Sequence, residues 1–182
     1  MTVDTKPNDL LLLAGKVIAV FMQIAMAVGG AALLVALPAI LIFRDDVSEA
    51  FGSEADYLAS PLLYLAGVML IGLAIVAMLF VFFGTLRRII ATVGEGDPFA
   101  PANANRLSLM GWLMLGVQLS LIPATALGIQ LARYADETED MNLTVDGGGM
   151  DLTGILLVII LFILARVFRH GAAMREDLEG TV

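Results

Sequence analysis

Residues 17–43 read VIAVFMQIAMAVGGAALLVALPAILIF, and no charged side chain lies between Lys16 and Arg44. A helix rises about 1.5 Å per residue, so roughly 20 apolar residues cross the hydrocarbon core of a bilayer, which is about 30 Å thick. The apolar part of a cleaved signal peptide is shorter, about 7–15 residues, and precedes a small-residue cleavage site. This stretch therefore predicts a transmembrane helix that is not removed as a signal peptide.

Three later stretches of the chain are also long and apolar. They predict spans at about 62–85, 107–131 and 152–168, and the last of these carries Arg166 near its end. Long basic side chains at a helix end reach the interface and keep their charge in water. Hydrophobic residues make up 59% of the chain and charged residues 15%, against roughly 25% charged residues in soluble domains. We expect an all-α integral membrane protein, a single four-helix transmembrane bundle over residues 1–182.

Lysine and arginine are unevenly divided between the two sides of such a bundle. One side holds Lys6, Lys16, Arg87, Arg88, Arg106, Arg166, Arg169 and Arg175, whereas the other holds Arg44 and Arg133. Basic residues collect in cytoplasmic loops. The division predicts a multi-pass protein of the bacterial cytoplasmic (inner) membrane, with its N- and C-termini in the cytoplasm and the lipid bilayer as its surroundings.

The two loops on the opposite side, residues 44–60 and 132–151, carry most of the acidic residues. A solvated acidic face is the simpler interpretation, and a cation-binding surface is the alternative. Within the second loop, Met141, Leu143 and Val145 alternate with polar residues and precede three glycines. Alternation with a period of two is typical of a strand, so we expect a short β-strand or hairpin there.

Small residues recur at helical spacing in two of the spans. They are Ala25, Gly29, Ala32 and Ala36 in the first span, and Gly116, Ser120, Ala124 and Gly128 in the third. Helices in lipid approach each other closely through small residues. We expect helix packing within the chain along both stripes, with a homo-oligomer contact as the alternative. Gln23 and Gln118 are expected to form hydrogen bonds between helices.

Several classes of site are disfavoured by what the chain lacks. It has no cysteine, which excludes disulfides and thiolate ligands, and its one histidine, His170, has no metal-ligating neighbour at a suitable spacing. No ionisable residue lies in the middle of a predicted span, and such residues are the usual mark of proton relays. We therefore expect no enzyme activity, no cofactor or metal site, no direct nucleic-acid binding and no proton-coupled transport.

The stretch between the second and third spans carries strong signals for the ends of helices. We expect the second helix to continue past the membrane to about Val93, where Gly94 and Gly96 end it ahead of Pro98. Asn103 or Asn105 is expected to cap the next helix, which would begin near Arg106 and Leu107.

Two parts of the chain carry a family resemblance. One is Gly96-Asp97-Pro98-Phe99 followed by Asn103, Asn105-Arg106-Leu107 and Gly111-Trp112, and the other is Val167-Phe168-Arg169 followed by Gly171, Arg175, Asp177 and Thr181-Val182. Together they resemble the inner-loop and C-terminal signatures of an uncharacterised bacterial family of four-helix membrane proteins. Genes of that family often lie beside a gene for a small helix-turn-helix regulator. The resemblance implies a cytoplasmic DNA-binding protein as partner.

The function expected from these features is that of a non-enzymatic membrane sensor or adaptor. Its cytoplasmic docking surface would consist of Arg87, Arg88, Pro98, Phe99, Asn103, Asn105, Arg106, Arg169 and Arg175. A small transporter or channel subunit, or a structural subunit of a membrane complex, is the alternative.

Overall fold

The computed structural model describes residues 10–46, 61–136 and 151–179, and its regular structure over these residues is helical. The long helices are α1 (Leu10–Ile42), α3 (Pro61–Gly94), α4 (Pro101–Asp136) and α5 (Leu152–Glu179). Each is long and apolar enough to cross a membrane. The predicted all-α, four-helix transmembrane fold is confirmed. The predicted strand or hairpin falls on residues 141–149, outside the described part of the chain.

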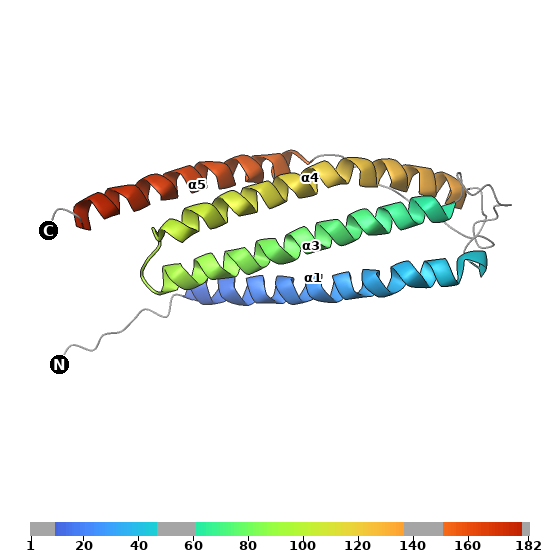
Figure 1. Cartoon of the computed structure of the whole chain (residues 1–182), viewed down its shortest axis with the longest axis horizontal. Coiled ribbons are helices and arrows are strands. Elements are labelled where there is room, and N and C mark those ends of the chain that lie inside the picture. Colours follow the sequence, from blue (N-terminus) through green and yellow to red (C-terminus); the bar gives the residue numbers. More distant parts are fainter. Residues whose placement is uncertain (1–9, 47–60, 137–150, 180–182) are drawn as a thin grey trace.

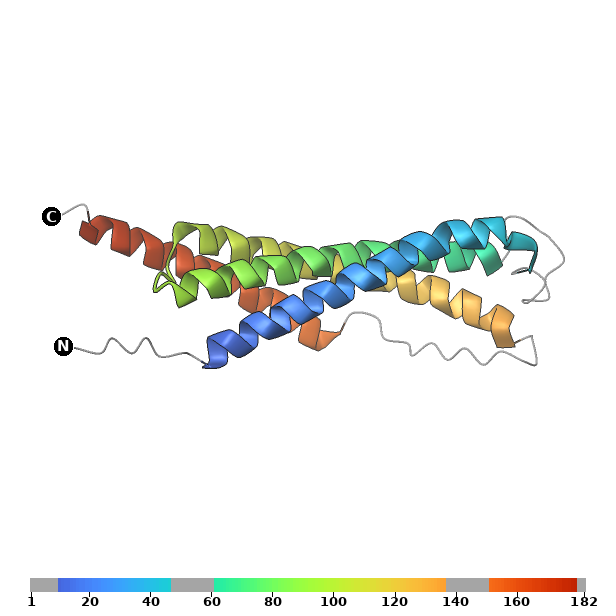
Figure 2. The same ribbon diagram turned by 90° about the horizontal axis from the view of Figure 1, so that it is seen from below.

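The four helices lie side by side in the order of the chain (Figure 1). In the described residues, α1 packs on α3, α3 on α4 and α4 on α5, and the backbones of the other helix pairs do not come close. Seen from below, α1 crosses α3 obliquely (Figure 2). The bundle is therefore an open row of helices, and every helix keeps a broad surface that lipid can solvate.

One end of the row gathers the segments that matter most for function. The start of α1, the turn between α3 and α4 (residues 95–100) and the last part of α5 all lie there (Figure 1), and we call it the turn end. Helix α3 has 34 residues, so it is about 51 Å long and exceeds a hydrocarbon core of about 30 Å. The predicted continuation of this helix to about Val93 is confirmed, because α3 ends at Gly94.

The core of the molecule sits in the turn-end half. Its buried members are Ile89 of α3, Leu107 and Met110 of α4, and Leu161 and Ala165 of α5. The partly buried side chains of Phe82, Leu86, Val93, Met114 and Phe168 pack around them. Members on one helix are three or four residues apart and so share a face. This packing fixes α3, α4 and α5 relative to one another directly beside the turn.

Helix α5 begins beside the middle of α4, and Figures 1 and 2 both show this stagger. Gln118 of α4 is 2% exposed, and its Nε2 donates to the carbonyl oxygen of Asp151, just before α5, at 2.8 Å. Gly154 allows this approach, because a side chain there would collide with the Gln118 amide. The predicted hydrogen bond between helices is confirmed for Gln118. Gln23 of α1 lies against Gly84 of α3.

One small residue of the predicted α4 stripe, Gly116, lies at the contact with α3. A Cβ atom on Gly116 would come within 2.8 Å of Met78 Sδ of α3, so the close approach that the sequence predicts does occur at this position. Ser120 donates its hydroxyl to the Gly116 carbonyl oxygen at 2.8 Å, which satisfies this polar group inside the apolar layer. Five further members of the two predicted stripes are half-buried: Ala25, Gly29, Ala36, Ala124 and Gly128.

Two positions of the predicted α1 stripe lie away from the contact with α3, and a homo-oligomer contact there stays a prediction. Nothing lies within 4 Å of a Cβ atom placed on Gly29, and Ala32 is exposed. The contact with α3 instead passes through Gly15 and Gly30, and Gly30 lies 3.4 Å from Val76 when given a Cβ atom. The physical reason is that α1 has a single helical neighbour, so only one narrow row of its residues is covered, and spacing alone does not identify which row.

Candidate functional site

The turn at the end of α3 is built by a glycine in a left-handed conformation. Gly96 has a φ of 87°. The amide of Gly96 donates to the Val93 carbonyl oxygen at 3.1 Å, and that of Asp97 donates to the Thr92 carbonyl oxygen at 3.1 Å. These two bonds form the Schellman arrangement that satisfies the last carbonyl groups of a helix. The helix end that the sequence predicts at these glycines is confirmed.

Asn103 ties the turn to α3 through its side-chain amide. Its Nδ2 donates to Thr92 Oγ1 at 2.8 Å and to the Pro98 carbonyl oxygen at 3.0 Å. Its Oδ1 accepts a hydrogen bond of 2.9 Å from Arg106 Nη1. The Thr92 hydroxyl in turn donates to the carbonyl oxygen of Ile89 at 2.8 Å. Asn103 is 0% exposed, so this network is what satisfies it.

The predicted start of the third helix is therefore wrong. Helix α4 begins at Pro101, and neither Asn103 nor Asn105 is its cap. Proline suits the first position of a helix, because its φ is already helical and the amide it lacks would have no partner there. Asn103 consequently lies in the first turn, where its side chain points back to the turn and to α3 instead of capping a new helix.

The turn also binds the last part of α5, across a long separation in sequence. Arg175 Nη1 donates to Asp97 Oδ1 at 2.5 Å, and both side chains are about half exposed. The rings of Phe99 and Phe168 have their centroids 5.4 Å apart. Gly171 lies under Phe99 so closely that a Cβ atom there would approach the ring to 2.7 Å. The two signature segments thus form one continuous surface, which we call the turn–tail surface.

The nine residues predicted for docking are all at the turn end, but they differ in exposure. Those at the surface are Arg87, Arg88, Phe99, Asn105, Arg169 and Arg175, whereas Pro98 and Arg106 are half-buried. Asn103 is buried and cannot touch a partner in this conformation. Its role in the site is to position the turn. The hydrogen bonds that bury Asn103 join it to Thr92, Pro98 and Arg106, and the sequence alone carries no signal for them.

The turn–tail surface carries charged groups of both signs around an apolar centre: the arginines lie beside Glu95, Asp97, Glu176 and Asp177. In the described part of the chain, no carboxylate forms an ion pair with Arg87, Arg88 or Arg169. Phe99 is 42% exposed. A guanidinium group offers a planar fork of donors that suits carboxylates and phosphates. Such a surface can bind an acidic group and an apolar side chain together.

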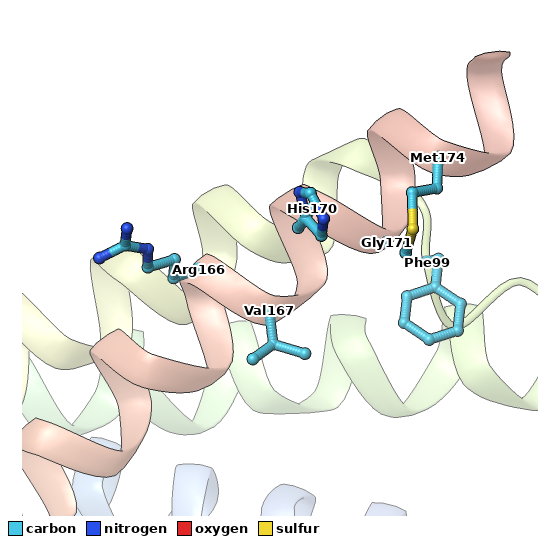
Figure 3. A pocket seen from close by; sticks show the side chains of 6 residues that line it. All are labelled: Phe99, Arg166, Val167, His170, Gly171 and Met174. Atoms are coloured by element: carbon cyan, nitrogen blue, oxygen red, sulfur yellow. The ribbon is translucent and has the colours of Figure 1, made fainter.

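An open groove of about 610 Å³ adjoins this surface (Figure 3). Its lining comes from the turn and from α5: Phe99, Arg166, Val167, His170, Gly171 and Met174. Sequence reasoning did not assign a groove, because Phe99 and Met174 meet only once the turn folds against α5. Val167 and Gly171 did carry a signal, since both belong to the C-terminal signature. Met174 carried none.

Helices of this length and composition define a multi-pass membrane protein. A family model described as a protein of unknown function (DUF2975) matches residues 46–182, which include the turn and all of α3, α4 and α5. The chain belongs to this family, and the resemblance to an uncharacterised four-helix family is confirmed. Comparisons with curated proteins and with solved structures find no match.

Proposed function

We propose that the protein is a non-enzymatic sensor or adaptor of the bacterial cytoplasmic membrane, with its turn end and both termini in the cytoplasm. In this proposal the turn–tail surface docks a cytoplasmic helix-turn-helix regulator. The observation that carries it is the contact of Asp97 and Phe99 with Arg175, Phe168 and Gly171. The contact unites the two signature segments, which lie far apart in the chain, into one exposed surface outside the apolar layer.

The distribution of charge supports the orientation. The turn end carries Arg87, Arg88 and Arg106 from the helices that flank the turn, together with Arg166, Arg169 and Arg175 of α5. Basic residues within short distances of helix ends favour the cytoplasmic side. A soluble partner in the cytoplasm would then meet this end first, and the exposed arginines would pair with acidic groups on its surface.

The test is co-purification from membranes with the helix-turn-helix protein that the resemblance predicts to be encoded beside the gene. Arg87→Glu with Arg88→Glu reverses two exposed charges without touching the Asn103 network. We expect co-purification to fall about tenfold or more, as loss of roughly 1.4 kcal/mol implies. Arg133→Glu, an exposed arginine near the other end of α4, is the matched control. Undiminished recovery with the double variant would remove the docking proposal.

A small transporter or channel subunit is the second candidate, and the start of α5 favours it. The sequence places no ionisable group in the middle of a span, but the structure sets Asp151 beside Gln118, at the middle of α4. A groove of about 330 Å³ opens there, lined by Met114, Asp151, Thr153, Gly154, Leu156, Leu157 and Ile160. Ionisable groups at membrane depth are typical of ion pathways. Asp151 therefore makes proton-coupled transport a candidate again, although the sequence disfavours it.

Proteoliposomes with an internal pH dye test this second candidate. If Asp151 serves a proton pathway, an imposed potential should drive proton entry with the wild-type protein, and Asp151→Asn should abolish it. Glu95→Gln, an exposed substitution in the turn, should leave the flux unchanged. Wild-type vesicles that conduct no better than empty ones would exclude proton transport by this protein on its own.

A further inference from the structure

We propose that the groove between Phe99 and α5 holds an anionic phospholipid of the leaflet at the turn end. Its phosphate would lie against Arg166 and His170, and one acyl chain would follow the face of α5. The inference goes beyond the docking of a protein partner and does not depend on it. Figure 3 shows Arg166 and Val167 toward one end of the groove, Phe99 and Met174 at the other, and His170 between them.

The depth of the groove matches the headgroup region. Residues 152–165 contain no charged side chain, so Arg166 is the first charge after the apolar part of α5. Arginine at such a position extends toward the interface, where the hydrocarbon ends. The groove begins at Arg166 and Val167 and continues to Met174, about two helical turns further, which is the layer that lipid phosphates occupy.

An apolar path leads from the hydrocarbon into the groove. Leu156, Ile160, Ile163 and Val167 follow one another at intervals of three or four residues, so they share one face of α5. They are 56%, 42%, 57% and 54% exposed, respectively. Inside a membrane, acyl chains must cover this face. A lipid whose chain lies along it would place its own phosphate beside Arg166.

The positive charge of Arg166 and the absence of a lining carboxylate select an anionic headgroup. Among the described residues, ion pairs occur at Arg44–Asp45 and Arg175–Asp97, and neither Arg166 nor His170 pairs with a carboxylate there. Arginine binds phosphate oxygens through two parallel hydrogen bonds. No acidic side chain is among the six that line the groove, and an ammonium or choline group would find no counter-charge. Phosphatidylglycerol fits this pattern better than a zwitterionic lipid.

The walls of the groove strengthen that selection. Phe99 and Met174 close it at the end away from the membrane, and both are apolar (Figure 3). Low-dielectric walls concentrate the field of the Arg166 guanidinium and strengthen hydrogen bonds to a phosphate. The volume of about 610 Å³ falls within the roughly 300–1,000 Å³ of pockets that bind small molecules. A glycerol phosphate headgroup can enter it.

The experiment is a competition for lipid. The full-length protein in a neutral detergent is offered equal amounts of phosphatidylglycerol and phosphatidylcholine, and the lipid retained is read by native mass spectrometry. We expect wild-type protein to retain phosphatidylglycerol preferentially, and Arg166→Gln with His170→Gln to lower the preference about tenfold, as loss of a charge-assisted contact implies. Arg169→Gln is the matched control, because Arg169 is exposed on the same helix but does not line the groove.

A second measurement places the lipid at the groove. Trp112 is the single tryptophan, so Trp112→Phe with Ile163→Trp puts one fluorophore beside the expected acyl chain. In phosphatidylcholine vesicles, a minor fraction of acyl-brominated phosphatidylglycerol should quench it more than the same fraction of brominated phosphatidylcholine. The Arg166 and His170 substitutions should abolish the difference.

Three outcomes would overturn the proposal. Unchanged preference in the Arg166→Gln, His170→Gln protein would mean that the groove holds no headgroup. An equal loss with Arg169→Gln would mean a diffuse effect of charge. Full displacement of phosphatidylglycerol by excess inorganic phosphate would mean a site for a soluble anion instead of a lipid. Circular dichroism of each variant confirms that the helices are intact.

Discussion

The side-chain amide of Asn103 forms hydrogen bonds with the Thr92 hydroxyl, the Pro98 carbonyl oxygen and the Arg106 guanidinium. The residue is fully buried, so water does not reach it. Removal of one partner from such a network leaves the others unsatisfied in a buried place, which costs more than the bond itself. At the scale of the residue, the stability of the turn therefore depends on this one side chain more than on the exposed arginines around it.

Asn103→Ala should lower the free energy of unfolding by about 1–3 kcal/mol, since it leaves the Pro98 carbonyl oxygen and the Arg106 guanidinium without this partner. The measurement is thermal unfolding of the purified protein in detergent, followed by circular dichroism. Asn105→Ala, two residues on and exposed, should change stability by less than about 0.5 kcal/mol. Equal melting temperatures for the two variants would show that the network is not stabilising.

Gly154→Ala should weaken the contact between α4 and α5, because its methyl group would collide with the Gln118 amide. Overpacking of this kind costs about 1–3 kcal/mol, and the hydrogen bond to Asp151 should be lost with it. Thermal unfolding of the variant in detergent checks this loss. Gly29→Ala, where nothing lies within 4 Å, is the control, and Gln118→Ala combined with Gly154→Ala should recover part of the loss. A destabilisation equal to that of Gly29→Ala would contradict the structure.

At the scale of the element, the helices could be predicted from the sequence, but the displacement of each helix along its neighbour could not. The apolar runs predicted all four helices, and Gly96 predicted the end of α3, because these are local properties of the chain. The start of α4 was missed because Pro101 can begin a helix as well as follow one. The position of Asp151 beside Gln118 and the contact of Phe99 with Gly171 depend on how far neighbouring helices slide past each other. A single sequence contains no signal for that displacement.

An exposed ion pair and an aromatic contact help to hold the tail of α5 against the turn. Asp97→Arg should loosen it, which hydrogen exchange of the backbone amides near Arg175 would detect as lost protection. Since both partners are about half exposed, the effect should be below about 1 kcal/mol and should shrink at high salt. Asp97→Arg combined with Arg175→Asp should restore protection. If the double variant exchanges as fast as the single one, the pair does not hold the tail.

At the scale of the whole molecule, the proposed orientation can be tested cleanly because the chain has no cysteine. Single substitutions Asp45→Cys and Glu95→Cys place one thiol at each end of the row, at exposed positions. An impermeant maleimide applied to intact spheroplasts should label Asp45→Cys at once and Glu95→Cys only after the membrane is permeabilised. The reverse pattern would place the turn–tail surface outside the cell.

The open row also bears on the order in which the molecule is made. Each of the four helices packs only on its neighbours in chain order, so a newly inserted segment always finds the preceding helix, one of its partners, already in the membrane. Synthesis at about 5–20 residues per second gives each pair seconds to pack before the next segment leaves the ribosome. The exception is the turn–tail surface, which needs the last residues of α5. A truncated chain would therefore insert and still lack the one surface through which we propose that it signals.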